Sequence, residues 1–197
     1  MRACFACVAA SALLGAVASA DSITFNDLSL GTVVTNQYSS ATFSSISGQD
    51  NVVTNYTTNM ICTYDTGGDI NCTKPTFVDF TNPVNNLTFI AIEPNEFGVV
   101  STIRIFENYV YTADFNFTGL GGGPNQFGYG EKLVDLSAYS NVTRIEILGP
   151  GGVGDLDNSY GGNGIGWDTF CFDVVPAPGA GALLALSSVL ALLRRRV

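Results

Sequence analysis

The sequence contains no histidine and few cations, because eight Lys and Arg stand against 17 Asp and Glu. The absence of histidine excludes Ser-His and Cys-His nucleophile pairs and metal sites that depend on imidazole. The formal net charge of −9 repels phosphates, so nucleic acid is not an expected partner. Carboxylate chemistry, such as the paired acids of a glycosidase, is the enzymatic route that remains. Since no two acids stand out, we expect a protein that is not an enzyme.

Residues 1–20 have the three parts of a secretory signal peptide. Arg2 supplies a positive charge, Phe5 to Val17 is an apolar segment, and Ala18-Ser19-Ala20 is a small-residue cleavage site. A lipoprotein would need a cysteine directly after the cut, where this chain has Asp21. We therefore predict an exported protein whose mature chain begins at Asp21.

Residues 175–197 form a second targeting segment, with a proline hinge, an apolar run from Ala180 to Leu193 and an arginine cluster. A helix from Gly179 to Leu193 would be about 22 Å long. The hydrocarbon layer of a bilayer is about 30 Å thick, so this helix is a short anchor. The arginines would hold that end on the cytoplasmic side. We predict a membrane anchor that is either lasting or transient.

This order of hinge, apolar helix and cations resembles the C-terminal sorting signal of bacterial PEP-CTERM proteins. The resemblance covers only this segment and rests on Val175, Pro176, Pro178, Arg194, Arg195 and Arg196. Ala177 stands where the usual motif has Glu. The resemblance implies a membrane transpeptidase of the exosortase type as a partner. It also implies a place in the cell envelope or release to the extracellular matrix; a single-pass anchor without processing is the alternative.

The body between these segments, residues 21–174, reads as one β domain. It holds all 17 acids but only four cations, a net charge of −13. Apolar and polar residues alternate in short runs that Gly, Asn, Asp and Pro separate. The expected strands are Ser22–Phe25, Phe77–Phe80, Asn86–Ile92, Val99–Phe106, Tyr109–Phe117, Val142–Leu148 and Trp167–Val174. We predict an all-β fold, a single antiparallel sandwich or jelly roll, flanked by the signal helix and the C-terminal apolar helix.

Cysteine usage suits an exported domain. Cys62 and Cys72 flank a turn signal at Asp65 to Asp69, which predicts a hairpin stapled by a disulfide. Cys171 has no partner in the body, and we expect a small buried or half-buried apolar residue rather than a reactive thiol.

Asp168 shares the parity of Phe170 and Phe172 in the last expected strand, which places a carboxylate on the core face. A buried carboxylate needs a partner. Three alternatives stay open: Arg104 or Arg144, backbone N–H groups of a loop, or a calcium ion held with carbonyls and Asp27 or Asn26.

The segments Gly164–Phe170 and Ile23–Leu28 resemble the last and first strands of galactose-binding-like jelly-roll domains of exported bacterial proteins. The resemblance implies a structural calcium that ties the two ends of the domain together.

Two glycine-rich loops, Gly119–Gly130 and Gly149–Gly166, carry or adjoin aromatic residues that could stack on a polysaccharide. These residues are Phe127, Tyr129, Tyr160 and Trp167. The alternative is that the rings cover the ends of the core. The sequence thus favours an exported, non-catalytic envelope or matrix protein, with a cell-surface carbohydrate-binding module as the alternative.

Overall fold

The computed structural model describes residues 19–46, 49–55, 58–64, 72, 74–93, 100–118, 130–148 and 165–176. The predicted signal helix and C-terminal apolar helix lie outside these residues. One compact unit spans Ser19–Val175, and the predicted body, residues 21–174, falls within it. A second unit, Met1–Ala18 with Pro176–Val197, lies outside the described residues except for Pro176. Within the part of the chain that is described, no helix has the length and hydropathy needed to span a bilayer.

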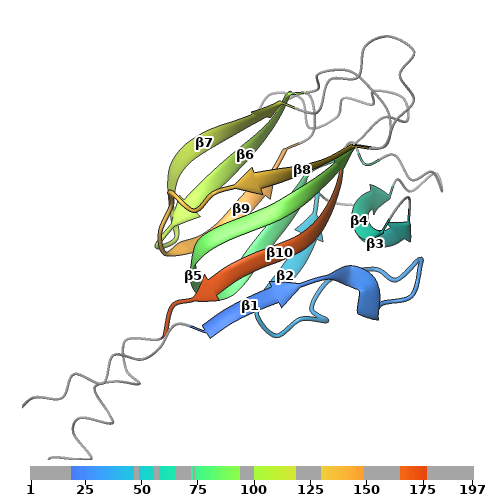
Figure 1. Ribbon diagram of the computed structural model, residues 1–197, viewed down its shortest axis with the longest axis horizontal. Coiled ribbons are helices and arrows are strands. Elements are labelled where there is room, and N and C mark those ends of the chain that lie inside the picture. Colours follow the sequence, from blue (N-terminus) through green and yellow to red (C-terminus); the bar gives the residue numbers. More distant parts are fainter. Residues whose placement is uncertain are drawn as a thin grey trace, which may run out of the picture. The chain divides into compact units, whose positions relative to one another are not determined.

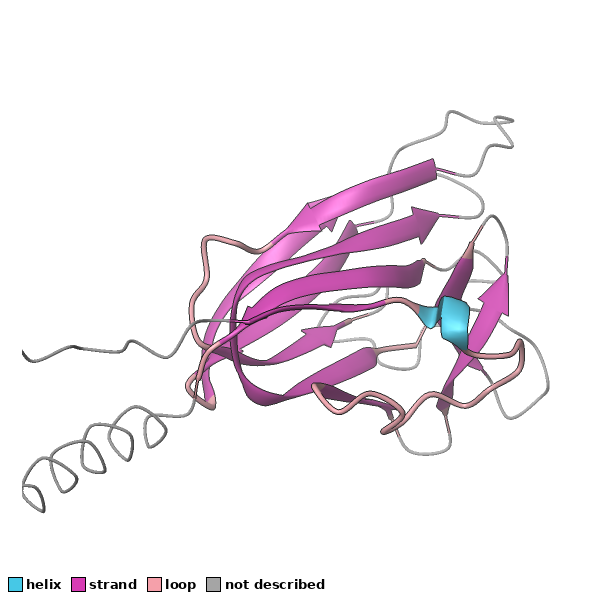
Figure 2. Ribbon diagram, turned by 60° about the horizontal axis from the view of Figure 1, so that its bottom comes forward, coloured by secondary structure: helices cyan, strands magenta, loops and turns pink. Residues whose placement is uncertain are grey.

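The described residues form a curled antiparallel sheet of ten strands (Figure 1). The strands are β1 (Ser19–Ile23), β2 (Ala41–Ser45), β3 (Asp50–Asn55), β4 (Asn59–Tyr64), β5 (Thr76–Glu93), β6 (Val100–Glu107), β7 (Val110–Thr118), β8 (Gly130–Asp135), β9 (Val142–Ile147) and β10 (Gly166–Val174). A 3-10 helix, η1 (Phe25–Asp27), follows β1 and is cyan in Figure 2. The predicted antiparallel β fold is therefore confirmed.

Strand β5 is the longest, and its partners change along its length. Its first part, residues 76–80, pairs with β2 and β9, whereas its second part, from Val84 onward, pairs with β10 and β8 and keeps one pair with β9, Val84 with Val142. The pattern predicts two strands here, but the chain continues through Pro83 as one strand with a register shift between Asp79 and Val84. Proline lacks an N–H for the ladder, and the Pro83 carbonyl accepts a hydrogen bond from the Val175 backbone at 2.8 Å.

Figure 2 shows how the strands curl. Buried apolar residues from strands along the whole chain form one core within this curl. Ile103 and Ile105 of β6 and Ile145 and Ile147 of β9 are buried, as their alternation predicts. A cluster of edge-to-face and stacked rings fills the centre: Phe25, Phe43, Phe89 and Phe170. Each fully buried phenylalanine side chain contributes roughly 2–3 kcal/mol through loss of apolar surface to water.

The opposite face of the sheet carries a ladder of ion pairs. Arg144 Nη1 donates to both carboxylate oxygens of Asp79 at 2.8 Å, and its Nε donates to Glu146 at 3.0 Å. Arg104 Nε donates to Asp114 at 3.3 Å and its Nη1 lies 3.8 Å from Glu146. All of these side chains are partly exposed, so each pair contributes at most about 1 kcal/mol.

A bulge changes the predicted face of Tyr111. The alternation places Tyr111 with Ala113 and Phe115, but Thr112 is an extra residue between the pairs Ile105–Ala113 and Phe106–Tyr111. Tyr111 consequently turns to the outer face, where the Arg104 guanidinium carbon lies 5.3 Å from the centre of its ring.

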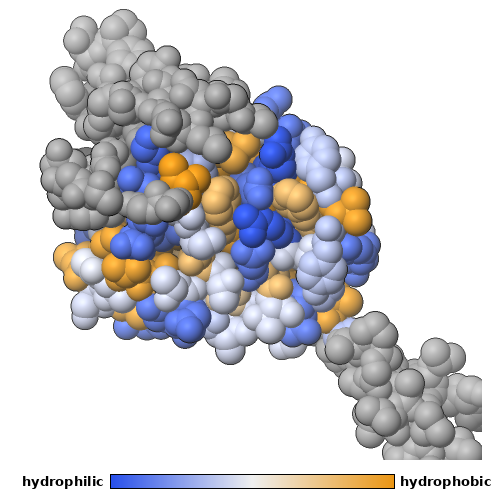
Figure 3. Space-filling view, turned by 180° about the vertical axis from the view of Figure 1, so that it is seen from behind, coloured by the Kyte–Doolittle hydropathy of each residue, from blue (hydrophilic) through white to orange (hydrophobic). Residues whose placement is uncertain are grey.

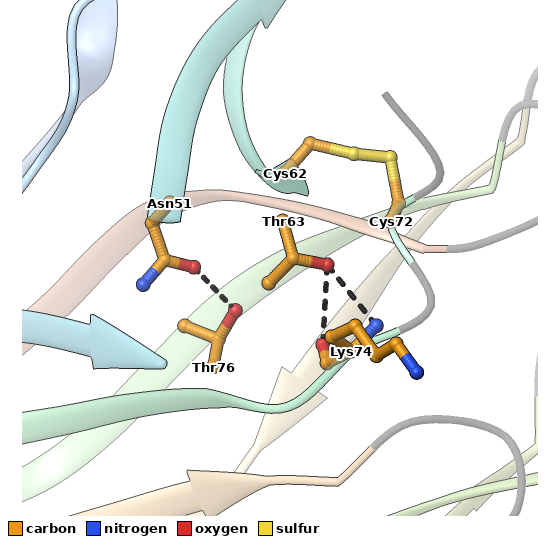
Figure 4. The surroundings of a disulfide bond; sticks show 6 residues. All are labelled: Asn51, Cys62, Thr63, Cys72, Lys74 and Thr76. Atoms are coloured by element: carbon orange, nitrogen blue, oxygen red, sulfur yellow. Dashed lines mark hydrogen bonds between the residues drawn. A yellow bond between two sulfur atoms is a disulfide. The ribbon is translucent and has the colours of Figure 1, made fainter. Parts of the chain in front are cut away.

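The disulfide between Cys62 and Cys72 is confirmed, and its Cα atoms lie 4.7 Å apart (Figure 4). Cys62 lies in β4, but Cys72 lies outside the strands. The bond therefore joins a strand to a connection, rather than the two strands of the hairpin that the sequence predicts. Cys171 is half-buried and is not in a disulfide.

Polar side chains beside the disulfide are paired within the interior (Figure 4). The buried Asn51 amide donates to the Ser44 carbonyl at 2.8 Å and accepts from the Thr76 hydroxyl at 2.7 Å. The Thr63 hydroxyl accepts from the Lys74 backbone N–H at 3.1 Å and donates to the Lys74 carbonyl at 3.3 Å. These bonds join β3, β2 and the chain that enters β5, so the disulfide reinforces a region that is already cross-linked.

Replacing Cys62 and Cys72 together by alanine should lower the free energy of unfolding by about 2–3 kcal/mol, because the bond closes a short loop in the unfolded chain. Guanidinium unfolding of the oxidised protein measures the change. Cys171→Ala is the matched control and should change stability less. Equal losses in both proteins would show that the bond adds no stability.

Candidate functional site

Trp167 is the one described member of the predicted aromatic set, since Phe127, Tyr129 and Tyr160 lie outside the described residues. Its side chain is 5% exposed and packs edge-to-face on Phe89, with ring centres 5.8 Å apart. A ring in this position is not presented to a sugar. Its placement corresponds to the core-packing alternative.

Asp168 is buried, with 4% of its surface exposed. The core-facing position at this end of β10 belongs to its neighbour Trp167, which pairs with Ala91, whereas Asp168 pairs with Ile90. The predicted parity of Asp168 with Phe170 therefore does not hold across the bulge that follows.

Directly after Asp168, the pairing of β10 with β5 shifts register between Asp168 and Cys171. Thr169 occupies this bulge at φ +48°, a conformation that β-branched residues rarely adopt and that costs of order 1–3 kcal/mol. The strained backbone directs the Thr169 N–H to Asp168 Oδ1 at 2.7 Å.

Two further groups of the protein stabilise the Asp168 carboxylate. The Thr58 hydroxyl donates to Oδ2 at 3.2 Å, and the backbone of Phe25 also hydrogen-bonds to the carboxylate. Arg104 and Arg144, the other predicted partners, pair with acids on the outer face instead. Backbone N–H groups and a hydroxyl therefore serve Asp168, and the arginine alternative is wrong.

Tyr38 and Asp27 lie beside this carboxylate. The Tyr38 hydroxyl is 2.7 Å from the Thr24 carbonyl and 2.7 Å from Asp27 Oδ1. Burial, the hydrogen bond to Asp27 and the negative charges of Asp27 and Asp168 raise the pKa of Tyr38 well above its ordinary value. A neutral phenol has one proton for two acceptors, so oxygens outnumber protons at this place. We call Asp27, Tyr38, Thr58 and Asp168 the Asp168 cluster.

The Asp168 cluster meets part of the demand of a calcium ion, which takes six to eight oxygen ligands from carboxylates, carbonyls and water. Asp27 and the Thr24 carbonyl contact the Tyr38 hydroxyl and supply such oxygens. Asn26 and Asp27 are both exposed. Among the described residues, no group of three or more His, Cys, Asp or Glu could hold a metal ion. A calcium ion here would need carbonyls and waters for most of its shell, and it stays a prediction.

The sequence does not reveal Tyr38 or Thr58 as members of this cluster. Both lie in connections between strands, and Thr58 reaches Asp168 across 110 positions of the chain. No spacing motif signals such a contact. The pairing of β1 with β10, which brings the Ile23–Leu28 segment to the last strand, is the feature that assembles the cluster.

An open hollow of about 410 Å³ lies where β1, β5 and β10 meet. Asp21 and Asp173 both line it, together with Asn86 and Cys171. Ala20 pairs with Asp173 and Asp21 pairs with Phe172, so the two aspartates belong to successive pairs. Asn86 holds Asp173 by a hydrogen bond of 2.7 Å.

Neither the family models nor the curated proteins contain a match to this sequence.

Calcium should raise the melting temperature of EDTA-treated protein if the Asp168 cluster holds the ion, because a ligand that binds only the folded state stabilises it. Asp168→Asn should lose this response, and magnesium, which prefers a smaller octahedral shell, should not replace calcium. Differential scanning calorimetry measures both. A melting temperature that ignores calcium in the wild type would remove the calcium prediction.

The charge on Asp168 should make the calcium-free protein less stable as the pH rises. Burial raises the pKa of Asp168 above its ordinary value of 3.8, despite the opposing hydrogen bonds. The folded state therefore keeps this proton to a higher pH than the unfolded state, and stability falls from the ordinary value up through the raised pKa. The free energy of unfolding of the wild type minus that of Asp168→Asn should decline as the pH rises from 3.8 to the raised pKa. Above the raised pKa, this difference should stay constant. Denaturant unfolding in EDTA at a series of pH values tests this, and parallel profiles would contradict it.

Proposed function

We propose that the chain is an exported, non-catalytic β protein that the C-terminal segment retains at the cell envelope or delivers to the extracellular matrix. The observation that carries the proposal is the extent of the folded unit. Ser19–Val175 forms one compact unit, and the predicted signal peptide and sorting segment overlap this unit only at Ser19, Ala20 and Val175. We therefore interpret the chain as one folded domain between a signal peptide and a C-terminal sorting segment.

The proposed cleavage after Ala20 is compatible with the pairing of β1. Five residue pairs join β1 to β10, and cleavage would remove the outer two, Ser19–Val174 and Ala20–Asp173. Ser19 and Ala20 are exposed, whereas Ile23 at the other end of β1 is buried in the core. The retained pairs include Ile23 with Phe170, so β1 keeps the contact that anchors it.

The surface composition and the disulfide support a location outside the cytoplasm. Disulfides persist in oxidising compartments, and the Cys62–Cys72 bond belongs to such an environment. On the face seen in Figure 3, apolar side chains form small areas that hydrophilic ones separate. The acidic body suits a protein that must avoid self-association in a crowded envelope.

We also propose that the curled sheet is a β-sandwich. The change of partners along β5 supports it, because one half of β5 then belongs to each layer. Inward-facing Val78 and Phe80 of the first half and Leu87 and Phe89 of the second half belong to one core.

Several described acids are bound by donors of the protein, which favours a structural role for these side chains. On the outer face Asp79, Asp114 and Glu146 are bound to arginines, and Asp168 is held by donors of the protein. The carbohydrate-binding alternative now depends on Phe127, Tyr129 and Tyr160, because Trp167 is in the core. Binding of the purified body to a polysaccharide on a glycan array would favour that alternative.

Expression of the full chain in a bacterium that has the sorting transpeptidase should yield a protein that begins at Asp21 and fractionates with membranes or with the extracellular matrix. A chain that ends at Val174 should be exported but found free in the periplasm or medium. Replacement of Arg194, Arg195 and Arg196 by alanine tests the cationic end alone. An intact chain that stays in the cytoplasm, with residues 1–20 attached, would overturn the proposal.

A further inference from the structure

Three consecutive apolar or aromatic residues at the turn between β6 and β7 are exposed. The side chains of Tyr109, Val110 and Tyr111 are 76%, 66% and 50% exposed. We call these three residues the β6–β7 tip. Single exposed apolar residues are common, whereas three consecutive ones at a turn are a candidate contact surface.

The backbone of this turn is strained to place an aromatic ring at its end. Asn108 and Tyr109 have φ of +50° and +66°, as a two-residue hairpin turn with positive φ at both positions requires. Asn and Gly usually occupy such positions, whereas a bulky side chain at positive φ is an outlier. Strain that a smaller residue would relieve points to a role for the Tyr109 ring.

The β6–β7 tip is held rigidly. The Asn108 N–H donates to the Asn141 carbonyl at 3.0 Å, and the Tyr109 N–H donates to the Thr143 hydroxyl at 2.9 Å. Thr143 in turn donates to the Phe106 carbonyl at 3.2 Å. The two tyrosines are therefore presented on a fixed backbone, and little conformational entropy remains to be lost when they bind.

The tip lies at the end of the sheet from which the C-terminal segment leaves. Successive ladder partners form one row across β10, β5, β9, β6 and β7: Val174, Val84, Val142, Glu107 and Val110. This row spans four strand spacings, or about 19 Å. Figure 1 shows the β6–β7 turn and the end of β10 at the same, left-hand side of the sheet.

Chain length limits how far this end of the sheet can be from a membrane. The apolar run begins at Ala180, six residues after Val174. Six extended residues span at most about 20 Å. If the run lies in a bilayer, as the proposed function requires, Val174 is within roughly 20 Å of the bilayer surface. Val110, at the other end of the row, is then within roughly 40 Å of that surface, and it comes as close as Val174 when the row lies parallel to the bilayer.

We propose that the β6–β7 tip docks on the lipid surface that holds the C-terminal segment, with Tyr109 and Tyr111 in the headgroup region. This inference rests on the proposed membrane retention. Tyrosine is enriched at membrane–water interfaces because its ring is apolar and its hydroxyl is polar. Glu107, the acid of the row, accepts a hydrogen bond of 2.6 Å from the Ser140 N–H, which ties it to the protein. The net charge of −13 on the body favours a zwitterionic surface over an anionic one.

Depth-dependent quenching tests the proposal on the full chain in phosphatidylcholine vesicles that contain brominated phosphatidylcholine. Tyr109→Trp places a reporter at the tip, and the native Trp167 is in the core and common to all samples. Leu133→Trp is the matched control: Leu133 is 56% exposed, and its partner Ile90 lies six residues along β5 from Val84, about 20 Å from the row. The quenching added by the Tyr109→Trp reporter should be several-fold that added by the Leu133→Trp reporter. Tyr111→Trp repeats the measurement if Tyr109→Trp does not fold.

Three other outcomes would contradict the inference, and each identifies which premise is wrong. Equal quenching of the two reporters, with the chain bound to vesicles, overturns the docking of the tip and leaves membrane retention intact. A chain that does not sediment with vesicles overturns membrane retention and the inference with it. A blue shift of the Tyr109→Trp emission that grows with protein concentration in the absence of lipid would assign the tip to a second copy of the chain.

Discussion

The pairing of β5 with four different strands is the constraint on which the rest of the structure depends. A strand of 18 residues cannot stay flat against one set of neighbours, because sheets twist by about 20–25° per strand. The register shift between Asp79 and Val84 divides β5 into one half bound to β2 and β9 and another bound to β10 and β8. The sheet curls around this strand, and side chains from both halves meet in one core.

Curling also explains why a carboxylate is buried. β10 must follow the second half of β5, and its two register irregularities lie on either side of Cys171. The first of them turns the Thr169 N–H toward Asp168 and places Thr169 at positive φ. The carboxylate thus satisfies a distorted stretch of backbone and ties it to Thr58 and to the segment after β1. The strain at Thr169 and the burial of Asp168 are two consequences of one bulge.

The sequence predicts the strands whose buried and exposed faces alternate cleanly, and it misses the others for physical reasons. β6 and β9 follow a period of two, so their inward residues were predictable. β10 keeps this period only from Phe170 onward, because the bulge after Asp168 leaves Trp167 and Asp168 both buried. β3 has four consecutive buried residues, which removes the alternation, and the segment around Val33 bridges to Val52 along its edge. β2 is rich in Ser and Thr, and β8 buries Val134 among charged residues. The face of Tyr111 and the Asp168 cluster depend on bulges and on contacts distant in sequence, which periodicity cannot reveal.

Both chain ends and the β6–β7 tip follow from the same arrangement of strands. Because β1 pairs with the last strand in antiparallel register, Ser19 lies opposite Val174, and the predicted signal peptide and the predicted C-terminal segment both join the folded unit at this end of the sheet. The ladder then extends from Val174 through β5 and β9 to the turn after β6. If the chain is tethered to a membrane through this end, the β6–β7 turn faces the lipid. The exposure of Tyr109 there, on a strained but well-bonded backbone, is what such an orientation would require.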